Sequence, residues 1–117
     1  ARPVIRVLFP VFIVFYPMKM EEPMLNELFE IIVSRKDNPR PGSYTASLFA
    51  KGEDAICQKV GEEAVEVILA AKGQGRQRVM EECADLFYHT LVLLAQCNVT
   101  LADVEEELRR RHLQRGG

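Results

Sequence analysis

Two long segments with apolar side chains at helical spacing, separated by a three-residue break, place the strongest constraint on the fold of this chain. The segments cover residues 53–72 and 76–97, and Gly73-Gln74-Gly75 lies between them. A connection this short makes the two predicted helices antiparallel neighbours. The second segment is apolar almost all round, which predicts that it is buried. Because no segment shows convincing two-residue alternation, the sequence predicts an all-α fold, a helical bundle built on this hairpin.

Shorter segments bring the expected total to about five helices. Ser43 is placed to act as the N-cap of one of them, and Gly52 to end it. Asn98 is expected to cap the end of the second long helix, and Thr100 with Asp103 resembles a capping box at the start of the last helix. The short helices are expected over residues 22–35, 44–51 and from the capping box to about 113.

The N-terminal residues differ from the rest of the chain. Residues 4–16 are almost wholly apolar, but about 13 residues fall short of the ~20 that a membrane-spanning helix needs. Arg2 and Arg6 would suit a secretory signal, yet no small-residue cleavage site follows. We expect residues 1–20 to be an apolar leader. Residues 1–17 are expected to have no part in function, with membrane or export targeting, or an apolar arm packed on a partner chain, as alternatives. Residues 21–117 are expected to form one all-α domain without a membrane span.

Composition narrows the chemistry to the carboxylates. Fifteen basic side chains against 17 acidic ones give a net charge of −2, which disfavours nucleic-acid binding through positive charge. The three cysteines form no CxxC pair, so a disulfide framework and a cysteine-rich zinc site are both disfavoured, and a reducing compartment fits best. Two histidines are too few for a histidine-rich metal site.

Each long helix carries a pair of acids three residues apart in or beside its apolar stripe. At about 100° of rotation per residue, Glu63 and Glu82 fall within the stripes, and Glu66 and Asp85 fall at their borders. Four carboxylates that face one another require a cation, and oxygen ligands on a rigid scaffold suit Mg²⁺. Surface acids paired with lysine and arginine are the alternative. A di-iron site fails on ligand count, so His89 is expected in the core or behind the acids, oriented by Asp85.

These acids also resemble the motif of a known enzyme superfamily. Glu62-Glu63-Ala64-Val65-Glu66, then fifteen residues, then Glu82-Cys83-Ala84-Asp85 is similar to the EExxE…ExxD signature of the MazG-type all-α nucleoside triphosphate pyrophosphohydrolases. Within that superfamily, further stretches between about Leu25 and Arg111 resemble the phosphoribosyl-ATP pyrophosphohydrolases of histidine biosynthesis. These stretches are Ser43-Tyr44-Thr45 with Leu48-Phe49, Lys59-Val60-Gly61, Leu86 with Tyr88-His89, and Val104-Glu105-Glu106-Glu107-Leu108.

The resemblance implies a cytoplasmic homodimer that hydrolyses phosphoribosyl-ATP to phosphoribosyl-AMP and pyrophosphate, the second step of the pathway. It also implies Mg²⁺ held by the matching acids Glu63, Glu66, Glu82 and Asp85. Glu62 is the remaining acid of the motif, and we expect it to orient or deprotonate the attacking water. Such chemistry needs divalent cations because they offset the charge that shifts among the phosphate oxygens.

Cationic and hydroxyl side chains must meet the phosphates and the ribose of such a substrate. Lys59 lies one turn before Glu63 on the same face and is the first candidate for a catalytic and substrate-binding cation, with an ordinary ion pair to Glu63 as the alternative. Helix-end cations and hydroxyl groups are further candidates, for which solvated ends, an N-cap and packing are alternative roles. They are Arg35, Lys36, Lys51, Ser43, Tyr44 and Thr45.

One copy of the hairpin has too little cover for its apolar surface, so we expect dimerisation to complete a four-helix core. Gly61 costs up to about 1 kcal/mol inside a helix and indicates a close helix approach. Two other functions stay open: a housekeeping MazG-type pyrophosphohydrolase and a catalytically silent dimerisation module. The family enzyme is sometimes fused to the cyclohydrolase of the next step, so association with that partner is a further hypothesis.

Overall fold

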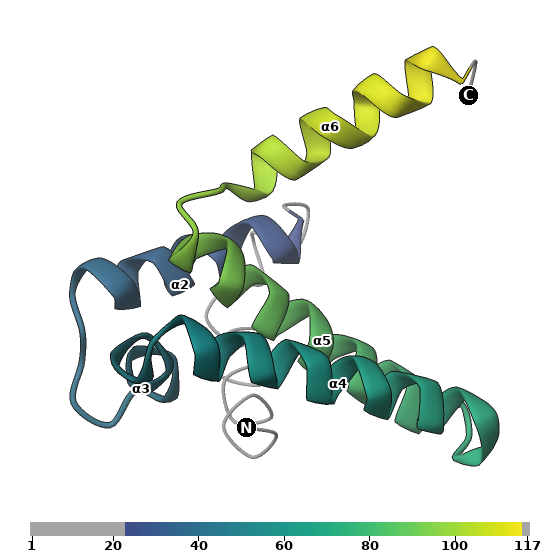
Figure 1. Ribbon diagram of the computed structural model, residues 1–117, viewed down its shortest axis with the longest axis horizontal. Helices are drawn as coiled ribbons and strands as arrows, with labels where there is room; N and C mark the ends of the chain where they lie inside the picture. The colour runs from purple at the N-terminus through teal and green to yellow at the C-terminus, as the bar shows by residue number, and fades with distance from the viewer. Residues whose placement is uncertain (1–22, 116–117) are drawn as a thin grey trace.

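The computed structural model describes residues 23–115, so the expected leader over residues 1–20 lies outside the described range. The described residues form five α-helices and no strand, which confirms the all-α prediction. The helices are α2 (Met24–Asp37), α3 (Tyr44–Lys51), α4 (Glu53–Gly73), α5 (Arg76–Gln96) and α6 (Leu101–Gln114) (Figure 1).

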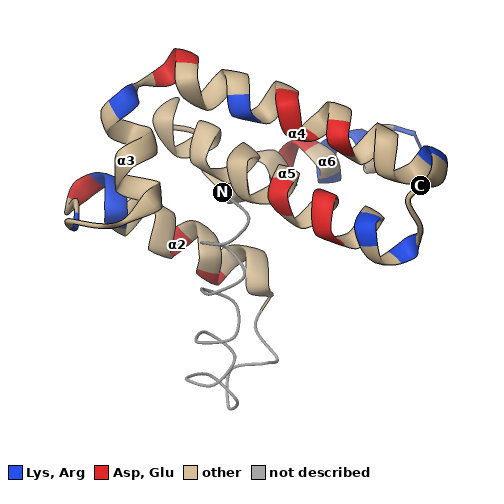
Figure 2. Cartoon of the chain, turned by 90° about the horizontal axis from the view of Figure 1, so that it is seen from below, with Lys and Arg blue, Asp and Glu red and all other residues tan. Residues whose placement is uncertain are grey.

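The hairpin of α4 and α5 forms the centre of the structure. The two helices run side by side along most of their length, α2 packs on α5, and α3 contacts both α2 and α4 (Figures 1 and 2). One apolar cluster joins these four helices at the end of the hairpin where α4 begins and α5 ends. Its buried members are Leu28, Ile32, Leu48, Ile56, Tyr88, Leu91, Val92 and Ala95. This core fixes the rotation of α4 and α5 about their axes and so fixes which side chains face between them.

Local chemistry sets the helix ends much as the sequence predicts. The Ser43 side chain accepts a hydrogen bond from the Ala46 amide at the start of α3. Thr100 and Asp103 form the capping box that begins α6. Asn98 adopts a positive φ of 58° after α5 and closes that helix in the manner of a Schellman motif. Helix α2, in contrast, continues two residues beyond the expected end at residue 35, because Pro39 acts only on the residue before it.

Two expectations about the long helices are wrong. Helix α5 is not buried all round, since Met80 and Phe87 are 44% and 51% exposed. Within the described chain Gly61 marks no close approach, because a Cβ added there meets no atom within 4 Å. The packed neighbours of α4 lie on its other face. Helix α6 extends away from the hairpin in Figure 1 and has no buried residue. None of the described helices is long and apolar enough to cross a membrane.

Candidate metal centre

Acidic side chains from the two long helices come together between α4 and α5. Glu63 on α4 is 2% exposed, and Glu82 and Asp85 on α5 are 0% and 3% exposed. Carboxylate oxygens of Glu63, Glu66 and Glu82 all lie within 4.8 Å of one another. Acidic segments of α4 and α5 face each other along the hairpin in Figure 2. The three-residue spacing within each pair places both acids on the face that each helix presents to the other.

The electrostatics of Glu63 indicate a site for a cation. Burial raises the pKa of Glu63, and the negative charges of Asp85, Glu66 and Glu82 raise it further, against the lowering effect of Lys59. Its Oε1 atom is buried without a hydrogen-bond partner among residues 23–115. Buried carboxylate oxygens in folded proteins normally have a hydrogen-bond donor or a positive charge beside them, which offsets the cost of removing them from water. A divalent cation among the three carboxylates would supply that charge.

The donor set fits Mg²⁺. At a metal–oxygen distance of about 2.1 Å, the oxygens of an octahedral shell lie roughly 3–4.2 Å apart. The spread of up to 4.8 Å among the Glu63, Glu66 and Glu82 oxygens lies just above that range, so a small closure of the side chains would meet it. Asp85 falls outside this tight group but lies close enough for its charge to act on Glu63. The structure thus brings together three of the four acids that the sequence predicts as ligands, with Asp85 beside them.

Lys59 and Glu62 lie beside the acids on α4. The Lys59 Nζ atom is 3.4 Å from a Glu62 oxygen and 3.5 Å from a Glu63 oxygen. Glu62 has an exposed side chain and also accepts a hydrogen bond of 3.0 Å from Gln58. Hydrogen bonds from Gln58 and Lys59 lower the pKa of Glu62, so it stays ionised at neutral pH and is a weak proton acceptor.

A second cation, Arg78 on α5, was missed in the sequence. Its guanidinium donates to the buried Glu82 carboxylate and, over 2.5 Å, to Glu81. The signal was available, because Arg78 precedes Glu82 by four residues as Lys59 precedes Glu63. Each helix therefore carries one cation a turn before its most buried acid. In an antiparallel hairpin these two cations lie towards opposite ends of the acidic cluster.

Tyr44 and His89 form a hydrogen-bonded pair next to the acids. The Tyr44 hydroxyl lies 3.0 Å from His89 Nε2, and His89 Nδ1 lies 2.8 Å from the Asp85 carbonyl oxygen. Burial, together with the charges of Glu63, Asp85 and Glu62, raises the pKa of Tyr44 to about 12. Burial lowers the pKa of His89 to about 4, so the imidazole is neutral at physiological pH. His89 thus lies in the core behind Asp85, as expected from the sequence.

Other candidate substrate-binding residues have structural partners. Lys36 donates to the Ala95 carbonyl oxygen at 2.7 Å and to Asn98 Oδ1 at 3.1 Å, and so caps the end of α5. The structure thereby places Lys36 in a stabilising role, away from the acids. Three others have local contacts: Ser43 is the N-cap of α3, Thr45 is buried against the Tyr88 hydroxyl, and Arg35 contacts Ser34. Lys51 is exposed at the end of α3.

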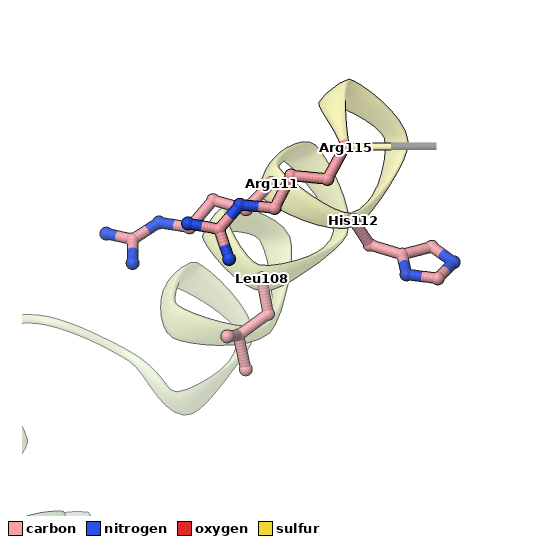
Figure 3. A pocket seen from close by; sticks show the side chains of 4 residues that line it. All are labelled: Leu108, Arg111, His112 and Arg115. Carbon is pink, nitrogen blue, oxygen red and sulfur yellow. The ribbon is translucent and has the colours of Figure 1, made fainter. Parts of the chain in front are cut away.

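Two open hollows of the described surface lie along α6, away from the acidic cluster. One is lined by Leu108, Arg111, His112 and Arg115, and Figure 3 shows its arginines and His112 projecting to different sides of the helix. The other shares Leu108 and His112 with it. A single helix supplies every side chain in both, so neither has the converging polar groups of a ligand site.

An all-helical hairpin that brings acids from both of its helices together is consistent with the class of MazG-type nucleotide pyrophosphohydrolases. The family model described as phosphoribosyl-ATP pyrophosphohydrolase matches residues 25–112. The chain belongs to this family and is a hydrolase. A "Phosphoribosyl-ATP pyrophosphatase" of Geotalea daltonii is 50% identical over 92 residues, which cover 79% of this chain and 87% of the relative.

Two further relatives agree with this assignment. A protein of the same name from Listeria welshimeri is 56% identical over 88 residues, or 75% of this chain and 84% of the relative. The "Histidine biosynthesis bifunctional protein HisIE" of Caldanaerobacter subterraneus is 51% identical over 89 residues. The match covers 76% of this chain but only 43% of that longer relative.

Proposed function

We propose that this chain hydrolyses phosphoribosyl-ATP to phosphoribosyl-AMP and pyrophosphate in histidine biosynthesis, and that the reaction depends on Mg²⁺. The names of the relatives support the substrate. The observation that carries the metal dependence is the group of mutually close and largely buried carboxylates between α4 and α5, in which Glu63 Oε1 has no hydrogen-bond partner within the described part of the chain. The same chemistry would also serve a housekeeping pyrophosphohydrolase, but the family match favours the biosynthetic substrate.

Glu63, Glu66, Glu82 and Asp85 would hold the cation. When bound, Mg²⁺ supplies positive charge that offsets the phosphate oxygens and lowers the pKa of bound water. The chain's own contribution is a rigid cluster of negative charge, assembled before substrate arrives by the packing of α4 against α5. Preassembly matters because ligands that are already in place need little reorganisation during the reaction.

Lys59 and Glu62 act at the edge of this cluster. Lys59 is partly exposed and contacts two carboxylates, so it can exchange these contacts for a phosphate oxygen when substrate binds. Glu62 accepts two hydrogen bonds that favour its ionised form, which makes it better suited to orient the attacking water than to remove a proton completely. Arg78 holds Glu82 in position from the other end.

The assay that tests this proposal measures pyrophosphate release with and without Mg²⁺. Phosphoribosyl-ATP is compared with a panel of ordinary and damaged nucleoside triphosphates at equal concentration. We expect a strong preference for phosphoribosyl-ATP and loss of turnover in chelator. Preferred turnover of the panel would assign the chain to the housekeeping group. Absence of all turnover by folded protein would support a silent module.

We further propose that the enzyme is a cytoplasmic homodimer. Val65, Ile68 and Leu69 on α4 are 54%, 60% and 54% exposed, and Met80 and Phe87 on α5 add to the uncovered apolar surface. A second copy of the hairpin would cover such side chains in a four-helix core. Ile68→Glu is expected to shift sedimentation towards the monomer.

The bifunctional relative supports an association with the enzyme of the next step, which co-purification of the two proteins would test.

A further inference from the structure

A hydrogen-bonded chain leads from the backbone of Asp85 to the hydroxyl group of Tyr44. His89 lies in the middle of this chain with no exposed surface. Its Nδ1 contacts the Asp85 carbonyl oxygen at 2.8 Å, and its Nε2 contacts the Tyr44 hydroxyl at 3.0 Å. The ring plane of His89 makes an angle of 86° with that of Tyr88 and 87° with that of Tyr44. These edge-to-face contacts hold the imidazole in this orientation.

Elementary hydrogen-bond chemistry gives this chain a direction. A carbonyl oxygen can only accept, so the proton of the imidazole is on Nδ1. The ring is fully buried between a carbonyl and a hydroxyl and is therefore neutral, which leaves Nε2 with a lone pair. Tyr44 must then donate its proton to His89. The Tyr44 oxygen consequently has only lone pairs to offer to any other group.

The surroundings of Tyr44 decide what that group can be. Glu62, Glu63 and Asp85 are near enough for their negative charges to act on the phenol. A phosphate oxygen without a proton would meet only lone pairs on Tyr44 and could not form a hydrogen bond with it. A group with an O–H bond would find an acceptor. This differs from the expectation from the sequence, in which Tyr44 donates to phosphate or ribose or serves in packing.

Resting on the proposed function, we propose that the Tyr44 oxygen accepts a hydrogen bond from an O–H donor in the active site, and that His89 is the positioning residue that fixes this polarity. The donor is either a water on the bound cation or a sugar hydroxyl of the substrate. Both groups donate an O–H hydrogen bond, but only the sugar hydroxyl requires that substrate be present.

Nitrogen NMR of the imidazoles tests the direction without any turnover. The chain has two histidines, and His112 is an exposed reference on α6. We expect His89 to be the neutral form protonated on Nδ1, and Tyr44→Phe to move its Nε2 resonance towards that of an unbonded lone pair. A His89 protonated on Nε2, or an Nε2 resonance unchanged by Tyr44→Phe, would overturn the proposal. Because this measurement needs no substrate, its result does not depend on whether the proposed activity is correct.

A kinetic cycle then tests the positioning role. Tyr44→Phe is expected to lower kcat/KM about tenfold, the effect of one lost hydrogen bond. His89→Leu should cost a similar factor in the wild type and almost nothing further in Tyr44→Phe, since it acts through Tyr44. His89→Gln, whose amide oxygen can accept the Tyr44 proton, should recover part of the loss. Independent, multiplying effects of the two single changes would refute the positioning role.

Binding measurements separate the two donors. Tyr88→Phe is the matched control, because Tyr88 is buried against Thr45. If the donor is a metal-bound water, Tyr44→Phe weakens Mn²⁺ binding in the absence of substrate, while the control does not. If it is a sugar hydroxyl, Mn²⁺ binding is unchanged and KM for phosphoribosyl-ATP rises. Unchanged values of both quantities would contradict an acceptor role for Tyr44.

Discussion

Neutralising Glu63 should stabilise the metal-free protein and abolish its response to Mg²⁺. In the Glu63→Gln variant the side chain keeps nearly its shape but loses its charge. The charge is unfavourable in the metal-free fold, because burial and three neighbouring carboxylates raise the pKa of Glu63. The same charge is needed when a cation is bound. The substitution therefore changes stability in opposite directions with and without metal, which a purely structural glutamate would not do.

The magnitude follows from the distances. Two unit charges at 4.8 Å, the upper limit of the separations in this group, repel by about 3.5 kcal/mol at an effective dielectric constant of about 20, and Glu63 has two neighbours within that limit in Glu66 and Glu82. Lys59 at 3.5 Å opposes this with about 4.7 kcal/mol of attraction. The balance leaves a net repulsion of about 2 kcal/mol, which the Arg78 charge beside Glu82 reduces. We expect Glu63→Gln to raise the free energy of unfolding in chelator by about 1–2 kcal/mol.

Urea unfolding followed by circular dichroism, at one protein concentration, measures both effects. Wild type should gain about 2.7 kcal/mol at a Mg²⁺ concentration 100 times the dissociation constant. Glu63→Gln should gain little and should release no pyrophosphate. Glu30→Gln, an exposed acid on α2, is the control and should behave as wild type. A Glu63→Gln protein that is less stable in chelator, yet still stabilised by Mg²⁺, would refute the reasoning.

Three further changes test the fold around the site. Gly61→Ala should raise the free energy of unfolding by up to about 1 kcal/mol, since a Cβ there meets no atom of the described residues within 4 Å. A lower free energy of unfolding in urea would mean that another chain occupies the space. Lys36→Met should lower stability by about 1–3 kcal/mol through its lost hydrogen bonds at the end of α5, with kcat and KM unchanged; a raised KM would return it to the substrate site. Thr100→Ala should cost about 1 kcal/mol of α6 stability, measured as lost helical circular dichroism. Hydrogen bonds from Thr100 hold the pKa of Asp103 below its ordinary 3.8, so the capping box is complete above about pH 4. Helix α6 should therefore lose helicity as the pH falls below that value. Helicity that does not change with pH in this range would contradict the capping role of Asp103.

Local signals predicted most of the fold. Serine, threonine, asparagine and glycine act on the adjacent backbone, so the ends of α3, α5 and α6 could be predicted from Ser43, Gly52, Asn98 and Thr100. The directions of the buried acids also followed from helical periodicity alone. Both inferences need only the geometry of one helix and its neighbours in sequence.

Features that depend on tertiary packing could not be predicted in the same way. The contact between Tyr44 and His89 joins residues 45 positions apart and depends on how α3 sits against α5. Lys36 reaches the end of α5 across 59 positions, and no local pattern distinguishes that role from phosphate binding. Exposure of Phe87 likewise depends on which faces of α5 the other helices cover. Arg78 is different, because its spacing to Glu82 was visible and was overlooked.

The most direct test of the acidic cluster as a metal centre is a crystal of this protein grown with Mn²⁺ and measured at the manganese absorption edge. The anomalous difference map locates the ion without reference to activity. We predict a peak between α4 and α5, within coordinating distance of Glu63, Glu66, Glu82 and Asp85. A map with no peak there at saturating Mn²⁺, or with its only peak at other residues, would contradict the account.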